Sequence, residues 1–139
     1  MSEAWPGTEN HGMTVTSPHE LEHWIGLAAS AGIATAVHAI GDQATTEVLD
    51  AFAKSQSIAR VFGLRQRVEH AQYMKRSDVP RFRELGVTAS MQPRHCTADI
   101  PMNDLLAERD LVAYGWNSLR EAGAELVFGS DGPVEDPNP

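Results

Sequence analysis

Apolar and polar residues follow one another along the chain at two spacings, one typical of helices and the other of strands. The first clear pattern is helical and covers residues 17–32. Ser17 is a candidate N-cap, Pro18 suits the first helical position, and Glu20 completes a capping box. Gly32 is placed to end this helix. One apolar face is expected at helical spacing, formed by Leu21, Trp24, Ile25 and Ala28.

After this helix, short apolar runs alternate with helical patterns. Strands are expected at residues 33–40, 65–72, 87–92 and 125–130. Helices are expected at residues 43–56 and 77–86, and one or two more at residues 102–123. Strands that alternate with helices, with no hairpin signal between them, indicate βα units around a parallel sheet. The sequence therefore predicts one α/β domain over residues 1–139, with an N-terminal loop at 1–16 and a helix plus four βα units at 17–139.

The size and charge of the chain limit the classes of protein to which it can belong. Its 139 residues suffice for one domain with a modest core. The net charge of −8 argues against a nucleic-acid-binding protein, because no basic patch could dominate that excess of acidic groups. Cys96 is the one cysteine, so no internal disulfide is expected, and the cytoplasm is the expected compartment. Neither a signal peptide nor an apolar run of membrane-spanning length is visible, so no membrane association is expected.

Polar side chains stand at the ends of the four predicted strands. In chain order they are His38, His70, Gln92, Arg94, His95, Ser130 and Asp131. In a parallel sheet all the carboxyl ends of the strands share one edge, so four separate segments deliver polar groups to it. Parallel α/β proteins and barrels build their active sites at this edge. The pattern therefore predicts a functional site there.

Taken singly, these residues also have ordinary structural explanations. A lone histidine near a strand end is more often a hydrogen-bonded core residue than a ligand, and Asp131 can cap the turn that follows it. His95 can be a solvated loop residue. Cys96 beside it suggests a cysteine–histidine nucleophile, but neighbours in sequence rarely have the geometry of a catalytic pair. His19 and His23 lie four residues apart, and an exposed surface pair is favoured there over a metal site.

Taken together, two histidines and an aspartate match the ligand preferences of a divalent metal. Imidazole nitrogen and carboxylate oxygen suit zinc and related metals. A bound metal lowers the pKa of its water to about 7, and a neighbouring carboxylate can take and return protons. The pattern therefore favours His38, His70 and Asp131 as metal ligands, with Asp131 also available as a base.

Four short segments of the chain form an ordered set. They are VHAIGDQA from residue 37, RVEHAQ from residue 67, SMQPRH from residue 90 and YGWNSLREAGAELVFGSDGPVEDPNP from residue 114. In this order they resemble the amidohydrolase superfamily of metal-dependent hydrolases, and most of all the branch that includes N-substituted formamide deformylases. The resemblance runs from about Gly12 to Pro139.

The resemblance implies a (β/α)8 barrel with metal at the carboxyl ends of its strands, and it places this chain on strands five to eight. His38 and His70 then correspond to the metal-binding histidines of strands five and six. Asp131 corresponds to the aspartate of strand eight, which binds metal and acts as general base. His95 is expected to contact the substrate or its developing oxyanion, and Gln92 is expected to contact the substrate beside it.

The chain departs from the family pattern in what it lacks. Gly41 and Asp42 match the supporting turn after strand five, but the His-x-His pair of strand one and the bridging lysine of strand four have no counterpart. A complete barrel needs about 250 residues, so the chain is predicted to be half a barrel. A half-barrel exposes two sheet edges and one face, and we expect the isolated chain either to form a homodimer through that face or to aggregate.

The activity that the resemblance implies is metal-dependent hydrolysis of C–N bonds in small molecules of the amide or formamide type, with zinc as the expected metal. The alternative is a catalytically inactive fragment or interaction module derived from such an enzyme, which the missing strand-one pair favours. A flavodoxin-like binding domain is disfavoured, because no glycine-rich phosphate loop follows any predicted strand.

Overall fold

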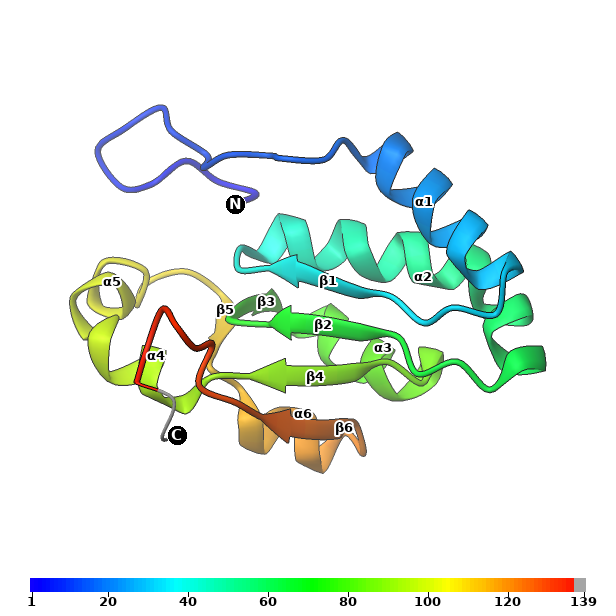
Figure 1. The fold of residues 1–139 in the computed structure, drawn as a ribbon. Coiled ribbons are helices and arrows are strands. Elements are labelled where there is room, and N and C mark those ends of the chain that lie inside the picture. The colour runs from blue at the N-terminus through cyan, green and yellow to red at the C-terminus, as the bar shows by residue number, and fades with distance from the viewer. Residues whose placement is uncertain (137–139) are drawn as a thin grey trace.

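The centre of the structure is a parallel sheet of four strands. The computed structural model describes residues 1–136. The strands run in the order β1-β2-β4-β6, and each pairs with its neighbour in parallel. Their bounds are β1 Ala36–Ala39, β2 Arg67–His70, β4 Thr88–Met91 and β6 Glu125–Phe128. Figure 1 shows the four arrows pointing the same way, with β1 and β6 at the two edges. The predicted parallel α/β arrangement is confirmed, with strands shorter than expected.

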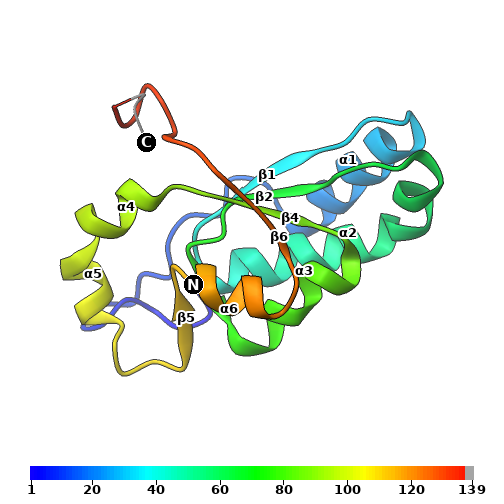
Figure 2. The ribbon, with the colours of Figure 1, turned by 90° about the horizontal axis from the view of Figure 1, so that it is seen from below.

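The main helices lie on one side of this sheet. They are α1 Pro18–Ser30, α2 Asp42–Phe62, α3 Val79–Leu85 and α6 Trp116–Glu121, and one 3-10 turn, Arg76–Asp78, leads into α3. Figure 2 shows α2, α3 and α6 together below the sheet. Within residues 1–136 this differs from a flavodoxin-like domain, whose helices cover both faces. None of the helices in the described part of the chain is both long and apolar enough to cross a lipid bilayer.

The two faces of the sheet carry different side chains, because successive residues of a strand point in opposite directions. The face toward the helices is apolar and joins the core through Val37, Ala39, Val68, Ala89, Met91 and Leu126. These side chains belong to one cluster with Leu49, Phe52, Phe82 and Leu119. The alternate positions form a mostly polar face that carries His38, Arg67, Glu69, Thr88, Ser90 and Glu125. The sheet therefore buries one face and leaves the polar face without a covering helix.

The sequence signals at the ends of the first two helices have clear structural counterparts. Ser17 and Glu20 form the predicted capping box, in which the Glu20 carboxylate accepts a hydrogen bond from the Ser17 backbone N–H at 3.1 Å. The second helix is longer than predicted and ends at Gly63, which is left-handed with φ 62°. The predicted apolar face of α1 was partly wrong. Trp24 is 62% exposed, whereas Ile25 and Ala29 are buried.

The chain between β4 and α6 differs from the prediction. It forms α4 Pro93–Ala98, α5 Ile100–Leu105 and β5 Leu111–Ala113, where a loop and one or two helices were expected. A second unpredicted strand, β3 Tyr73–Lys75, pairs with β5 in antiparallel register. A strand of three residues carries too short an apolar pattern to be recognised, and its pairing partner lies far away in the chain. Tertiary contact, rather than local preference, therefore decides this ribbon.

Candidate functional site

The carboxyl ends of β1, β2, β4 and β6 meet along one edge of the sheet, which we call the rim. The rim lies at the left of Figure 1, where α4, α5 and the chain after β6 also gather. His38 lies in β1 and His70 is the last residue of β2. His95 lies on α4, which follows β4, and Asp131 lies shortly after β6. The parallel sheet thus brings four separate segments to the rim.

Three of the predicted side chains converge at the rim. His70, His95 and Asp131 each offer one ligand atom, and these atoms lie within 4.8 Å of one another. The imidazoles of His70 and His95 are stacked, with ring centroids 5.5 Å apart and planes 13° apart. Nε2 of His95 lies 3.9 Å from Oδ2 of Asp131. Among residues 1–136 this is the one group of three or more histidine, cysteine or acidic side chains with such spacing.

His38 lies beside this group. Its ring centroid is 4.3 Å from that of His70, with the planes at 68°. Its backbone position in the sheet is opposite Glu69, on the polar face. The role of His38 as a metal ligand stays a prediction, and the structure adds His95 to the side chains that lie within reach of a shared ion.

Two of the three converging residues have backbone conformations that L-residues rarely adopt. His70 has a φ of 73° and Asp131 a φ of 57°, and Ala71 continues the turn with a φ of 44°. A left-handed conformation at a residue other than glycine costs on the order of 1–3 kcal/mol, and it persists only where the surroundings fix it. Strain of this kind is concentrated at functional sites, which agrees with the position of both residues on the rim.

His70 is buried, and its surroundings favour the neutral imidazole. Burial lowers the pKa of His70, and nearby His38 and His95 also lower it, while Asp131 and Glu69 act in the opposite direction. Its Nδ1 atom is buried and has no hydrogen-bond partner among the described residues. Histidine binds metals as the neutral imidazole, so a buried ring nitrogen without a hydrogen-bond partner suits a metal ligand. The residues at the rim therefore fit a divalent metal ion.

Glu135 is a residue of this site that the sequence did not reveal. Its Oε1 lies 3.9 Å from Nε2 of His95, and its Oε2 lies 3.4 Å from Nε of Arg94. The sequence offered only a weak signal for it, namely an acidic residue a few positions beyond Asp131. With Asp131 also 3.9 Å away, two carboxylates flank the His95 imidazole.

Two further predicted residues make contacts close to their own strands. The buried Gln92 side chain donates a hydrogen bond from Nε2 to the Ser90 carbonyl at 3.4 Å, so its role toward a substrate stays a prediction. Asp42 is fully buried at the start of α2 and accepts hydrogen bonds from the backbone N–H of Ser2, at 3.0 Å, and from the Ser2 hydroxyl. Burial raises the pKa of Asp42, but the hydrogen bonds from Ser2 and the Gln43 backbone, together with the charge of the N-terminus, lower it overall.

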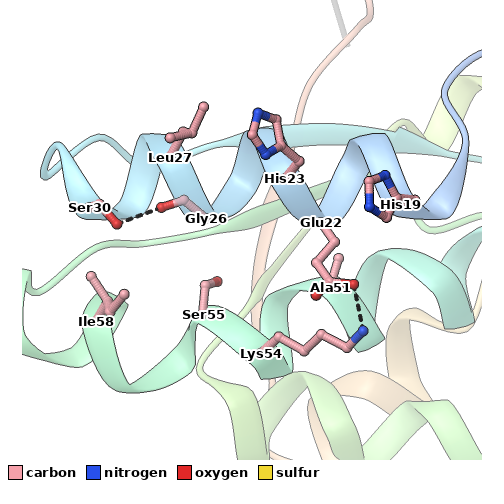
Figure 3. Close-up of a pocket in the computed structure, with 10 residues that line it drawn as sticks. All are labelled: His19, Glu22, His23, Gly26, Leu27, Ser30, Ala51, Lys54, Ser55 and Ile58. Atoms are coloured by element: carbon pink, nitrogen blue, oxygen red, sulfur yellow. Dashed lines mark hydrogen bonds and ion pairs between the residues drawn. The ribbon is translucent and has the colours of Figure 1, made fainter.

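A groove of about 420 Å³ lies elsewhere on the molecule, between α1 and α2 (Figure 3). His19, His23 and the ion pair between Lys54 and Glu22, at 2.5 Å, lie along it. Within residues 1–136 its histidines belong to no group of three ligand atoms with metal-like spacing. None of the converging side chains of the rim lines this groove, so the rim remains the candidate site.

A parallel α/β sheet that presents histidines and an aspartate at its carboxyl rim matches the architecture of metal-dependent hydrolases, and comparison with known proteins agrees. The match to the Amidohydrolase family covers residues 2–139. The chain therefore belongs to the Amidohydrolase family, and the superfamily predicted from the sequence is confirmed.

Two curated relatives match almost the whole chain. The protein LONG AFTER FAR-RED 3 of Arabidopsis thaliana is 38% identical over 136 residues, which cover 94% of this chain and 23% of that protein. The "Putative amidohydrolase YtcJ" of Bacillus subtilis is 30% identical over 131 residues, which cover 93% of this chain and 24% of that protein. The chain therefore spans about a quarter of the length of these relatives.

Two solved structures share the fold. Both are uncharacterized metal-dependent hydrolases, one from Pyrococcus furiosus with a TM-score of 0.74 and one from Pyrococcus horikoshii OT3 with a TM-score of 0.76. Each is 28% identical to this chain, and the match covers 96% of this chain and 26% of the solved chain.

Proposed function

We propose that this chain forms the metal-binding rim of an enzyme that hydrolyses C–N bonds in small molecules. The observation that carries the proposal is the convergence of His70, His95 and Asp131 within 4.8 Å at the carboxyl ends of parallel strands. Membership of the Amidohydrolase family supports a hydrolase. The substrate type, amides or N-substituted formamides, rests on the resemblance of the sequence motifs alone.

In this proposal the chain corresponds to strands five to eight of a (β/α)8 barrel. Support comes from four parallel strands in consecutive order with helices on one face, which is the local arrangement of such a barrel. The match covers about a quarter of each solved hydrolase chain, which agrees with the proposal that residues 1–139 are part of a larger catalytic domain. Residues 1–139 are then one partial catalytic domain.

We assign the metal to His38, His70 and Asp131, and zinc is the ion that this set implies. The donor types fit, and the orphaned Nδ1 of His70 supports the assignment. A bound divalent ion would lower the pKa of a water molecule to about 7 and polarise a carbonyl. In this scheme His95 is not a ligand but contacts the substrate carbonyl. A side chain with that role also has to lie within a few ångströms of the metal ligands, which agrees with the position of His95.

Proton transfer and the orientation of the substrate are assigned to side chains of this chain. Asp131 takes the proton of the attacking water and delivers it to the leaving nitrogen, as a general base and then a general acid. His95 orients the carbonyl oxygen, and its Nε2 lies 3.9 Å from a carboxylate oxygen of Asp131 and 3.9 Å from one of Glu135. Gln92 directly follows β4 at the rim, and in this proposal it contacts a part of the substrate away from the bond that is broken.

The first test is the zinc content of the purified chain, measured by elemental analysis after loading and dialysis. The wild-type chain is expected to hold close to one zinc ion, and His70→Ala and Asp131→Ala are expected to lose it because each removes a ligand. His95→Ala is expected to keep zinc. His19→Ala, which removes an exposed histidine on α1, is the matched control and is expected to keep zinc as well.

The second test is hydrolysis of a panel of N-substituted formamides and simple amides by the zinc-loaded chain. Asp131→Asn is expected to lower turnover by a factor of about 10²–10⁴, the usual contribution of a general acid–base group. Turnover that survives this substitution, or a wild-type chain that binds no zinc, would contradict the proposed function.

A further inference from the structure

Helix α4, which carries His95, and the following helix α5 are held at the rim without buried side chains of their own. The apolar side chains of Ile100 and Leu105 on α5 are instead 56% and 63% exposed. Apolar packing, which fixes most helices in a domain, is therefore weak here. The position of His95 has to depend on other contacts.

Asp99, at the junction of α4 and α5, supplies such contacts. Its Oδ2 atom accepts a hydrogen bond from Nε2 of Gln72 at 2.5 Å and another from the hydroxyl of Tyr114 at 2.6 Å. Its backbone N–H donates a hydrogen bond to the carbonyl of His95 at 2.9 Å. One residue thus connects α4 with the chain after β2 and with the chain after β5.

The two donors are themselves joined, so the network closes on itself. The backbone N–H of Tyr114 donates a hydrogen bond to the carbonyl of Gln72 at 2.8 Å. Gln72 is buried and lies in the turn that begins with the strained His70. A second link, from the hydroxyl of Tyr73 to Oδ1 of Asn103 at 2.9 Å, holds α5 to the same ribbon.

We propose that Asp99 is the positioning residue that holds His95 against His70 at the rim. The assignment deepens the proposed function and rests on it, because it explains how one side chain of that site keeps its place. Hydrogen bonds to a carboxylate are shorter and stronger than those between neutral groups, so two of them can replace absent packing.

The state of Tyr114 agrees with this arrangement. Burial raises the pKa of the Tyr114 phenol, and the hydrogen bond to Asp99 and the negative charge of Asp99 raise it further. The phenol therefore stays protonated and keeps its hydrogen available for the carboxylate throughout the neutral range.

The test compares Asp99→Ala with Asp104→Asn, which removes an exposed carboxylate on the same helix pair. Nuclear Overhauser contacts between the rings of His70 and His95 are measured on the chain without metal. The wild type and Asp104→Asn are expected to show them, because the ring centroids lie 5.5 Å apart. Asp99→Ala is expected to lose them. If Asp99→Ala keeps these contacts, the proposal is wrong.

A second readout is the affinity for Co²⁺, followed by titration. Asp99→Ala and Asp104→Asn are both expected to bind Co²⁺ within about twofold of wild type, because His95 is not one of the assigned metal ligands. A loss of about 10-fold or more in Asp99→Ala would mean that the substitution disturbs the metal ligands themselves, and it would overturn the proposal. A wild-type chain that binds no Co²⁺ would refute the proposed metal site, and the ring contacts would still decide the role of Asp99.

Two milder variants guard against a loss of folding in Asp99→Ala. Tyr114→Phe removes one donor, and Asp99→Asn keeps an oxygen acceptor while removing its charge. Both are expected to show weaker ring contacts than wild type and stronger ones than Asp99→Ala. Contacts of wild-type strength in Tyr114→Phe and Asp99→Asn alike would contradict the assignment.

Discussion

At the scale of single residues, backbone strain and burial coincide at His70. The residue has a φ of 73° and is only 6% exposed, and its Nδ1 has no partner among the described residues. A strained backbone and an unsatisfied buried nitrogen both cost free energy of folding. Asp131, with a φ of 57°, shows the same strain on the other side of the site. A residue selected for stability alone would have neither feature, so the rim is better explained by function.

A prediction at this scale concerns the phenol of Tyr114. Asp99→Asn should lower the pKa of Tyr114, because the substitution removes the negative charge that helps to keep the phenol protonated. Burial remains, so the pKa should stay above the ordinary value for tyrosine. The measurement is the ultraviolet absorbance of tyrosinate against pH. Tyr114→Phe identifies which of the two tyrosines titrates, and an unchanged pKa would refute the prediction.

At the scale of elements, local signals set where helices begin and end. The capping box of Ser17 and Glu20 and the left-handed Gly63 and Gly86 stand at helix ends. These signals depend on a few neighbouring residues and could be predicted, except that the end of α2 was placed too early. The ribbon of β3 and β5 could not be predicted, because each three-residue strand exists through its partner.

A second prediction compares two glycines around which an added Cβ meets no atom within 4 Å. Gly63 ends α2 with a φ of 62°, whereas Gly26 lies inside α1 with ordinary helical backbone. Gly63→Ala should lower the free energy of unfolding by about 1–2 kcal/mol, the cost of a Cβ in the left-handed conformation. Gly26→Ala should raise it by about 0.5–1 kcal/mol, the gain from helix propensity and a less flexible unfolded chain. Urea unfolding followed by circular dichroism measures both, and equal effects would contradict the explanation.

At the scale of the whole molecule, the sheet has two free edges and one open polar face among residues 1–136. The edges are β1 and β6, and each offers one side for pairing with a further strand. The open face carries the ion pair between Arg67 and Glu69, whose Nη2 and Oε1 atoms lie 3.1 Å apart. In the proposed barrel, this polar face would line the interior that the other strands enclose.

A third prediction is that the isolated chain forms a homodimer through this face and its edges. Val127 lies on the open face of β6 and is 37% exposed. Val127→Glu should weaken the dimer about 10-fold or more, because it places a new carboxylate near Glu125 inside the contact. Val61→Glu, the same change at an 81% exposed position of α2, should leave the dimer intact. Light scattering after gel filtration measures both, and a monodisperse wild-type monomer would contradict the prediction.

The sequence by itself determined the kind of sheet, the caps of the helices and the identities of the rim residues. These depend on spacing and on residue type, which are local properties of the chain. The tertiary structure decided which of these side chains meet. It placed His95 with His70 and Asp131, added Glu135, and buried Ala29 while leaving Trp24 exposed. Distances between residues far apart in the chain follow from packing and strand register, and no local pattern encodes them.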